Sequence, residues 1–475
     1  MQKTERIKAD IAIIGAGSGG LSVAAGAAQM GARVVLVEKG EMGGDCLNYG
    51  CVPSKALLAA AKVAQAQRKG AAFGIAPHEP QIDFAAVKAH VRSVIGAIAP
   101  HDSQERFEGF GVKVIRAAGE FVSPTELRAG GHLIEARRFV IATGSSPMVP
   151  PIPGLDRVPY LTNETIWDQT ERPEKLLIIG GGPIGMEMAQ AHRRLGSEVV
   201  VIEAMKALGK DDPDLAAVVL DHLRAEGVEI RENAAAEKVE TRDGRIVITL
   251  AGGEEVAGTH LLVAAGRRAN VDGLGLEKAG VDFTRRGVAV DDRLRTSNSK
   301  IFAIGDVAGG LQFTHVAGYH AGVVIRQALF RIWWAKAATK HIPWVTYTDP
   351  ELAQVGWTEA EAREKLGDKA EIVEWSFEDN DRAVAELRTE GRVKAILDAK
   401  GAIHGASIVG PGAGELIQVW ALAISKGLKI KDITGMVAPY PTLGEASKRA
   451  AGQFYAPKLF SERTRWIVRQ LLKLG

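Results

Sequence analysis

Two cysteines, Cys46 and Cys51, are the residues of this 475-residue chain whose type and spacing point most directly to chemistry. They lie five residues apart in the segment GGDCLNYGCVPSKALLAAA. Pro53 fits the first turn of the helix that the following Ala/Leu run predicts. Cys51 is therefore expected near a helix N-terminus, whose partial positive charge lowers the pKa of a thiol. Taken alone, such a pair is more often a pair of buried structural cysteines.

A glycine motif occurs twice, 165 residues apart, as IAIIGAGSGG at 11–20 and LLIIGGGPIG at 176–185. Each copy follows an apolar β-branched run and opens a helical stretch. Each is followed, 18 residues after its third glycine, by a glutamate at a strand end, Glu38 or Glu203. This context predicts two Rossmann dinucleotide sites, with phosphates on the helix N-terminus. The glycines concerned are Gly15, Gly17 and Gly20 in the first copy and Gly180, Gly182 and Gly185 in the second.

The position of the thiols beside a dinucleotide site favours a redox disulfide, because a dithiol exchanges two electrons and so does a flavin. The two cysteines are too few for a four-thiolate metal site, and no suitably spaced histidines lie nearby. No resident metal is expected.

The elements that must position these residues are those of two related α/β units. Each glycine copy continues into a β-rich insertion, 112–142 with a turn at 130–131 and 228–264 with turns at 243–244 and 252–253. The predicted fold is α/β, with two Rossmann-like dinucleotide-binding domains and a C-terminal α+β dimerisation domain. The predicted boundaries are 1–150 with 270–340, then 151–269, then 341–475.

Composition narrows the class of protein further. Lys plus Arg number 59 against 57 Asp plus Glu, so the net charge of +2 is too small for a nucleic-acid-binding surface. No run of 18 apolar residues and no signal-peptide pattern is present. We expect a cytoplasmic protein without nucleic-acid partners.

Three segments together resemble the pyridine nucleotide-disulfide oxidoreductases, the flavoprotein family that includes dihydrolipoamide dehydrogenase, glutathione reductase and mercuric reductase. GGDCLNYGCVPSKAL is similar to the family's redox-disulfide motif, IFAIGDVAG at 301–309 to its second flavin-binding segment, and PWVTYTDPELAQVGWTEAEA at 343–362 to the start of its interface domain. The resemblance extends over about residues 7–456. It implies an FAD enzyme that forms a homodimer, with an active site built from both subunits.

The resemblance also implies roles for individual residues. Cys51 would be the flavin-side, charge-transfer thiol, and Cys46 the interchange thiol that attacks the substrate. Lys55 and Glu187 would form an ion pair near the flavin ring; solvated helix charges are the alternative. The first glycine copy would bind FAD and the second the nicotinamide nucleotide. The cofactor-binding positions would also include Glu38 on the adenosine ribose, Asp306 on the ribityl chain, and Gly44, Thr143, Gly144 and Gly266.

The nicotinamide nucleotide is expected to be NADH. Glu203 can accept hydrogen bonds from a ribose 2′-hydroxyl and would repel a 2′-phosphate. Lys206 and Lys210 lie within reach of a phosphate, so NADPH stays open.

The chain departs from the family pattern at Tyr440, which stands where the disulfide reductases have a histidine. A phenol that titrates near 10 replaces poorly an imidazole that titrates near 6.5, so efficient turnover of dihydrolipoamide or glutathione disulfide is in doubt. Glu445 is expected to orient Tyr440 through a hydrogen bond; a plain helix N-terminal acid is the alternative. Mercuric reductases resemble this chain in having the tyrosine, but they add a C-terminal cysteine pair that the sequence lacks.

The function that follows is NAD(P)H-dependent reduction of a small disulfide or related acceptor. Hydride would pass from NADH to FAD, and electrons to the Cys46–Cys51 disulfide. The alternatives are a mercuric-reductase-like metal reductase, a quinone or oxygen diaphorase, and a non-catalytic subunit of a complex.

The last residues, 463–475, place Arg465, Arg469 and Lys473 on one helical face and apolar residues on another. Such a helix can lie on an anionic membrane surface, but more often it packs on its own domain, which is the expectation here. Trp333 and Trp334 are expected in a core or an interface.

Overall fold

The computed structural model describes residues 5–474, and their contacts divide the chain into two compact units. Unit 1 comprises the chain up to Gly180, Ala191–Ile202 and Ala235–Ala338. Unit 2 comprises Gly181–Gln190, Glu203–Ala234 and the chain from Thr339 on. The three-domain boundaries drawn from the sequence stay a prediction.

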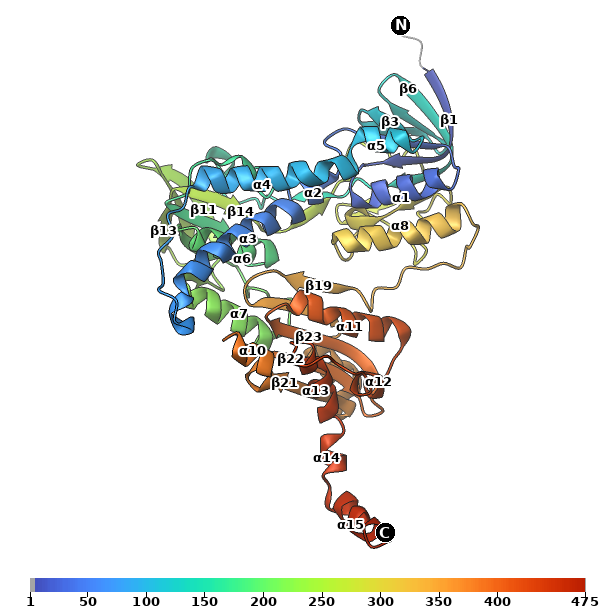
Figure 1. Ribbon diagram of the computed structural model, residues 1–475. Helices are drawn as coiled ribbons and strands as arrows, with labels where there is room; N and C mark the ends of the chain where they lie inside the picture. Colours follow the sequence, from blue (N-terminus) through green and yellow to red (C-terminus); the bar gives the residue numbers. More distant parts are fainter. Residues whose placement is uncertain (1–4, 475) are drawn as a thin grey trace. The chain divides into compact units, whose positions relative to one another are not determined.

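The main sheet of unit 1 is a seven-stranded sheet in the order β3-β2-β1-β6-β5-β4, with β18 also paired to β6 (Figure 1). Strands β3, β2, β1, β6 and β18 run parallel, and β4 and β5 add an antiparallel meander whose predicted turn at 130–131 joins β5 to β6. The strands are β1 (Glu5–Ile14), β2 (Val34–Glu38), β3 (Lys113–Arg116), β4 (Gly119–Ser123), β5 (Glu126–Ala129), β6 (His132–Ile141) and β18 (Ile301–Ala303). The helices of this part are α1 (Ser18–Gln29), α2 (Gly44–Asn48), α3 (Cys51–Arg68), α4 (Phe84–Ile98), α5 (Gln104–Gly109) and α8 (Thr314–Ala328).

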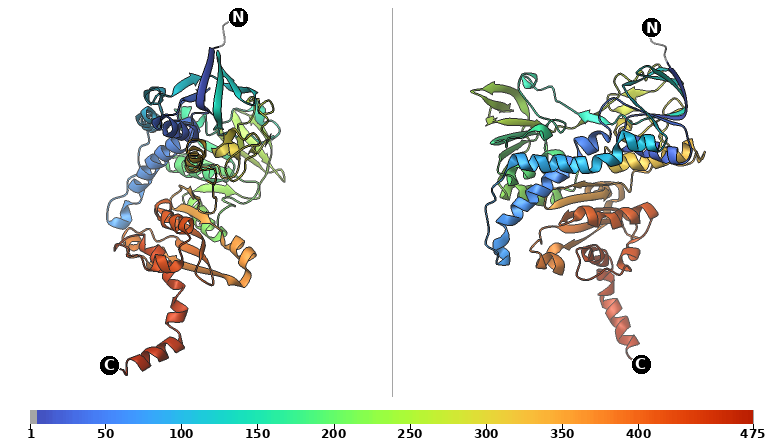
Figure 2. Two further views of the ribbon diagram at one scale, coloured as in Figure 1. Left: turned by 90° about the vertical axis from the view of Figure 1, so that its right-hand side faces the viewer. Right: turned by 45° about the horizontal axis from the view of Figure 1, so that its top comes forward.

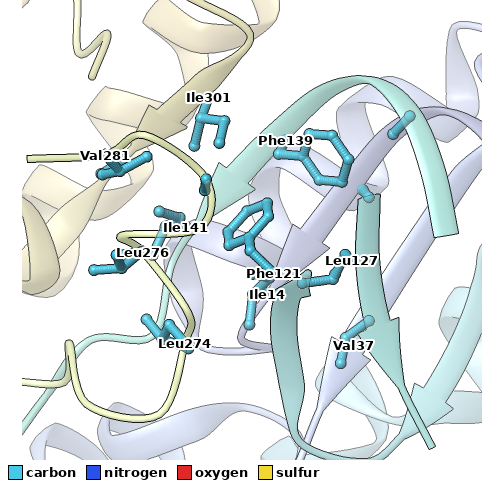
Figure 3. Packing of buried hydrophobic residues seen from close by; sticks show 14 of the residues in the cluster. Ile14, Val37, Phe121, Leu127, Phe139, Ile141, Leu274, Leu276, Val281 and Ile301 are labelled. Carbon is cyan, nitrogen blue, oxygen red and sulfur yellow. The ribbon is translucent and has the colours of Figure 1, made fainter. Parts of the chain in front are cut away.

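The two faces of this sheet carry separate cores, because successive side chains of a strand point to opposite faces. On one face Phe121 packs edge-on against Phe139, with ring centroids 5.3 Å apart, and Ile14 and Leu127 join them (Figure 3). On the other face, the alternate β1 residue Ile13 joins the cluster that contains the buried residues of α1 and α8. Both faces are covered, as a parallel sheet requires.

The second glycine copy repeats the first, which confirms the predicted repeat. Strand β8 (Lys175–Ile179) ends, and helix α6 (Pro183–Arg194) begins and ends, 165 residues after β1 and α1. Strand β8 lies parallel between β9 (Glu198–Ile202) and β14 (His260–Val263). The antiparallel ladder β11-β12-β13 forms with turns at the predicted positions. Its strands are β11 (Ala236–Arg242), β12 (Arg245–Leu250) and β13 (Glu255–Gly258), and the short strands of unit 1 are β7 (Ser145–Pro147), β15 (Arg267–Ala269), β16 (Phe283–Thr284) and β17 (Gly287–Val288).

The sheet of unit 2 has five antiparallel strands in the order β19-β20-β23-β22-β21. Its core includes the fully buried Trp420 and Phe377. The strands are β10 (Val228–Arg231), β19 (Pro343–Thr346), β20 (Glu351–Gly356), β21 (Ala370–Ser376), β22 (Arg392–Asp398) and β23 (Ile403–Gly410). The helices are α7 (Pro213–Ala225), α9 (Glu359–Leu366), α10 (Asp381–Ala385), α11 (Ala413–Lys426), α12 (Ile430–Thr434), α13 (Glu445–Gln453), α14 (Ala456–Leu459) and α15 (Glu462–Leu471).

Two expectations about apolar segments are now resolved. Trp333 and Trp334 are 62% and 67% exposed, so their placement in a core is wrong, and an interface stays a prediction. Among the helices of residues 5–474, none is both long and apolar enough to cross a membrane.

Candidate functional site

Two consecutive short turns present the thiols. Gly43 and Gly44 have φ of 87° and 61°, the left-handed region that glycine adopts without strain, and they lead into α2, which carries Cys46. Cys51 is the first residue of α3, so it lies at a helix N-terminus as predicted, with Pro53 in the first turn. Both cysteines are free thiols in the structure. The backbone thus brings the two predicted thiols together at one end of α3.

The two thiols differ in their electrostatics. A hydrogen bond from Cys46 lowers the pKa of Cys51, and the hydroxyl of Thr314 and the charge of Lys55 lower it further, against burial and the charge of Asp45. The same hydrogen bond raises the pKa of Cys46, which burial raises further. The distance from Cys51 Sγ to Thr314 Oγ1 is 3.4 Å. Cys51 therefore carries the stable thiolate, and Cys46 keeps its proton.

A buried ion network holds the segment that carries the thiols. Asp45, which precedes Cys46, accepts a hydrogen bond from Asn163 at 3.1 Å and pairs with the guanidinium of Arg267 at 3.1 Å. Arg267 also donates to Ser145 Oγ at 2.7 Å, and Ser145 in turn donates to Asp306 at 2.5 Å. Burial raises the pKa of Asp306. The network therefore ties the thiol segment to the segment that carries Asp306.

The first glycine motif forms a cradle that a side chain would fill. A Cβ on Gly15, whose φ is 105°, would lie 2.3 Å from the carbonyl oxygen of Ala142. A Cβ on Gly20 would lie 1.9 Å from Gly15 O, and a Cβ on Gly44 2.7 Å from Gly17 Cα. The backbone at this helix N-terminus is thus bare where a pyrophosphate would lie, so these residues fit FAD.

Glu38 lies at the end of β2 with both carboxylate oxygens engaged. Oε2 accepts from the amide of Ala16 and Oε1 from the amide of Gly40, each at 2.6 Å. The carboxylate is thereby fixed beside the glycine turn, which is the place expected for a residue that binds the adenosine ribose.

The second motif repeats this arrangement. Gly180 has φ of 115°, and a Cβ there would lie 2.4 Å from Ala264 O. A Cβ on Gly182 would meet nothing within 4 Å, so that position is open to a ligand, and Gly185 lies in the first turn of α6. Glu203 accepts from the amides of Gly181 at 2.7 Å and Met205 at 2.8 Å.

Three smaller residues predicted to line the cofactors lie in the segments that follow the two sheets. Thr143 donates to the carbonyl of Asn270 at 2.7 Å. Gly144 has φ of 67°, and a Cβ there would meet nothing within 4 Å. The carbonyl of Gly266 accepts from the amide of Met148 at 2.9 Å.

The predicted partners Lys55 and Glu187 belong to different units. Lys55 lies one turn after Cys51 on α3, where its charge lowers the pKa of that thiol. Glu187 is buried in α6 and accepts from the amide of Tyr347 at 3.0 Å. The ion pair between them stays a prediction.

The surroundings of Tyr440 differ from the expectation. Its hydroxyl donates to Asp381 at 2.8 Å rather than to Glu445, so the hydrogen bond expected from Glu445 is wrong. The Asp381 carboxylate raises the pKa of Tyr440, through the hydrogen bond and its charge, and Glu445 contributes only through its charge. Glu445 is the first residue of α13, the alternative position named for it, and its carboxylate lies 3.9 Å from Arg449.

Sequence reasoning missed four residues that bear on the site, namely Thr314, Asp45, Arg267 and Asp381. Thr314 and Arg267 lie more than 200 residues from the thiol motif, so no local pattern could connect them. Asp45 offered a signal, because it is a charged residue directly beside Cys46.

Two dinucleotide-binding folds with a thiol pair beside the first define a dinucleotide-dependent thiol oxidoreductase. Residues 9–321 match the family "Pyridine nucleotide-disulphide oxidoreductase", and residues 342–451 match its dimerisation domain. The chain belongs to this family.

Individual relatives agree with the family match. The chain is 37% identical to a mercuric reductase of Streptomyces lividans over 457 residues, which cover 94% of this chain and 96% of the relative. It is 37% identical to a dihydrolipoyl dehydrogenase of Thermus scotoductus over 466 residues, which cover 93% and 96%. The solved Cu(II) complex of the HOCl-induced flavoprotein disulfide reductase RclA from Escherichia coli superposes with a TM-score of 0.82 at 29% identity, and covers 92% of this chain and 98% of that one.

The protein is therefore a flavoprotein oxidoreductase that uses FAD and NAD(P)H. The match of its C-terminal part to a dimerisation domain supports a homodimer.

Proposed function

We propose that this enzyme takes electrons from NADH and delivers them, through Cys51 and Cys46, to a small disulfide or a related acceptor in the cytoplasm. The observation that carries the proposal is the asymmetry of the two thiols. Cys51 has a lowered pKa and three stabilising neighbours, whereas Cys46 has a raised pKa and keeps a proton. A pair in which one sulfur holds charge and the other holds a proton is suited to sequential exchange.

FAD, when bound, accepts a hydride from the nicotinamide and passes two electrons onward. The residues that would hold it are Gly15, Gly17, Gly20, Gly44 and Glu38, and Asp306 supplies a buried carboxyl group nearby in the chain's Ser145–Arg267 network. Glu203 would hold the ribose of NADH at the second motif.

The proposed exchange balances in sulfur, protons and electrons. Cys46, once deprotonated, attacks one sulfur of the substrate disulfide, and the departing thiolate takes up a proton. The Cys51 thiolate then attacks Cys46, releases the second substrate thiol, which also takes up a proton, and closes the Cys46–Cys51 disulfide. The enzyme dithiol is oxidised, and the substrate disulfide is reduced to two thiols.

The test is anaerobic NADH oxidation by the purified FAD enzyme with lipoamide, glutathione disulfide, Hg²⁺, Cu²⁺ and a quinone as acceptors. We expect turnover of at least one disulfide, abolished in Cys46→Ser and in Cys51→Ser. A diaphorase would reduce quinone equally well with and without Cys46. Activity restricted to quinone, unchanged by Cys46→Ser, would overturn the proposal.

A soft metal ion is the second candidate acceptor, and Tyr440 favours it. Because Asp381 raises the pKa of Tyr440, its phenol cannot serve as a base near neutral pH. A metal acceptor needs no proton on a leaving thiolate. Relatives at 37% identity include a mercuric reductase, and the RclA structure is a Cu(II) complex. Turnover of Hg²⁺ or Cu²⁺ without turnover of any disulfide would select this candidate.

A further inference from the structure

The chain carries a second functional feature in α15, which the redox chemistry does not use. Arg465, Arg469 and Lys473 follow one another at four-residue spacing, so they share one face of the helix. Ile467 and Leu471 lie on a different face, and Leu474 continues it at the next turn. The helix is therefore amphipathic, with a cationic polar face.

The apolar face of α15 is uncovered. None of its residues is buried, and Leu471, Leu472 and Leu474 are 59%, 76% and 83% exposed. The preceding helix α14 has no buried residue either. In both views of Figure 2 the red ribbon of α15 lies apart from the strands of its own unit. The expectation that this helix packs on its own domain is therefore wrong, and a short amphipathic helix needs a surface to bury its apolar face.

The charge of α15 indicates which surface covers it. Within residues 462–473 there are four cations, Arg463, Arg465, Arg469 and Lys473, against the single anion Glu462, which pairs with Arg465 at 3.2 Å. Trp466 is exposed, and tryptophan favours the interface between lipid and water. An anionic surface complements this helix, whereas a second copy of it would bring four like charges together.

The position of α15 in the chain also argues against the dimer interface. The match to the family's dimerisation domain ends at residue 451, before α14 begins at Ala456. Ten helical residues span only about 15 Å, too short to cross a bilayer, so the helix would lie in the surface plane.

We propose that α15 binds the surface of an anionic phospholipid bilayer, with Ile467, Leu471 and Leu474 in the acyl boundary and Arg465, Arg469 and Lys473 at the headgroups. The inference is independent of the identity of the electron acceptor.

The test is co-sedimentation of the full-length FAD enzyme with vesicles of phosphatidylcholine alone or with about one third phosphatidylglycerol. We expect binding to the anionic vesicles only, weakened by salt. Since each basic residue near such a surface contributes roughly fivefold in affinity, Arg465→Glu with Arg469→Glu should lower binding by more than roughly tenfold. Leu471→Ser with Leu474→Ser should also abolish it, and NADH oxidation should be unchanged in both.

The matched control is Trp333→Ala with Trp334→Ala, which removes the other exposed aromatic site of the described chain and should leave binding unchanged. Loss of binding in this control alone would assign the membrane contact to that loop and overturn the proposal. Equal binding to neutral vesicles, or none to either, would overturn it as well. If removal of residues 461–475 changed the oligomeric state in light scattering, a second copy would be the occupant instead.

Discussion

Single charges around Cys51 set the reactivity of the thiol pair. Hydrogen bonds from Cys46 and Thr314 and the charge of Lys55 all lower the pKa of Cys51. Since the thiolate is the reactive form, the fraction of thiolate near pH 7 depends on these neighbours.

We predict that Lys55→Met raises the pKa of Cys51 toward the ordinary thiol value. The rate of alkylation of Cys51 by iodoacetamide in the reduced enzyme should fall roughly three- to tenfold at pH 7 and recover at higher pH. Lys62→Met, an exposed lysine farther along α3, is the control and should leave the pH profile in place. An unchanged profile in Lys55→Met would show that Lys55 does not act on this thiol.

Tyr440 decides whether a proton can be moved to and from a substrate thiol. Asp381 holds the phenol by a hydrogen bond and raises its pKa, so Tyr440 stays protonated at neutral pH and can donate a proton but not accept one. We predict that Tyr440→His raises turnover of small disulfides at pH 7 by roughly ten- to hundredfold, because an imidazole does both. Steady-state kinetics between pH 6 and 9 measure this. A Tyr440→Phe variant that lost all disulfide activity would show instead that the phenol itself is required.

At the scale of elements, the β9–α6 turn selects the nucleotide. Glu203 accepts from the amides of Gly181 and Met205, which fixes its carboxylate at the end of β9. Glu203→Gln keeps an oxygen that can accept one of these bonds and removes the charge. We predict that the ratio of kcat/KM for NADH over NADPH falls roughly tenfold, because the repulsion of a 2′-phosphate is lost. Glu198→Gln, at the opposite end of β9, should not change the ratio.

The sequence was sufficient for elements whose signals are local. The repeat of β1 and α1 in β8 and α6, and the turns at 130–131, 243–244 and 252–253, follow from periodicity and glycine positions. Contacts that join distant segments could not be predicted, as Thr314 against Cys51 and Arg267 against Asp45 show. The exposure of α15 was missed for a related reason, since an amphipathic pattern does not specify what covers its apolar face.

At the scale of the whole molecule, one buried lysine joins separate stretches of unit 2. Lys394 on β22 is almost fully buried, and its Nζ lies 3.1 Å from Asp212, 3.0 Å from Glu359 and 3.4 Å from Glu374. Burial disfavours the lysine charge, but the hydrogen bonds of Glu359 and Asp212 outweigh it and raise the pKa of Lys394. Burial likewise opposes the ionisation of Glu359, and the hydrogen bonds of Lys394 and Arg363 outweigh it and lower the pKa of Glu359.

We predict that Lys394→Met lowers the free energy of unfolding by about 3 to 5 kcal/mol at pH 7, because it leaves the buried Asp212 carboxylate without its cation. Urea unfolding of the FAD-loaded enzyme, followed by circular dichroism, measures the loss. Lys400→Met, in the exposed turn between β22 and β23, is the control and should change stability little. The pH dependence has a definite sign. A raised lysine pKa contributes stability that persists through neutral pH and is lost only as pH rises through the folded-state value. A lowered glutamate pKa contributes stability that is lost as pH falls through its folded-state value. The difference between wild type and Lys394→Met should therefore be constant around neutral pH and shrink in acid below about pH 4, where the carboxylates become protonated. A difference that grew in acid would show that the cluster destabilises the fold.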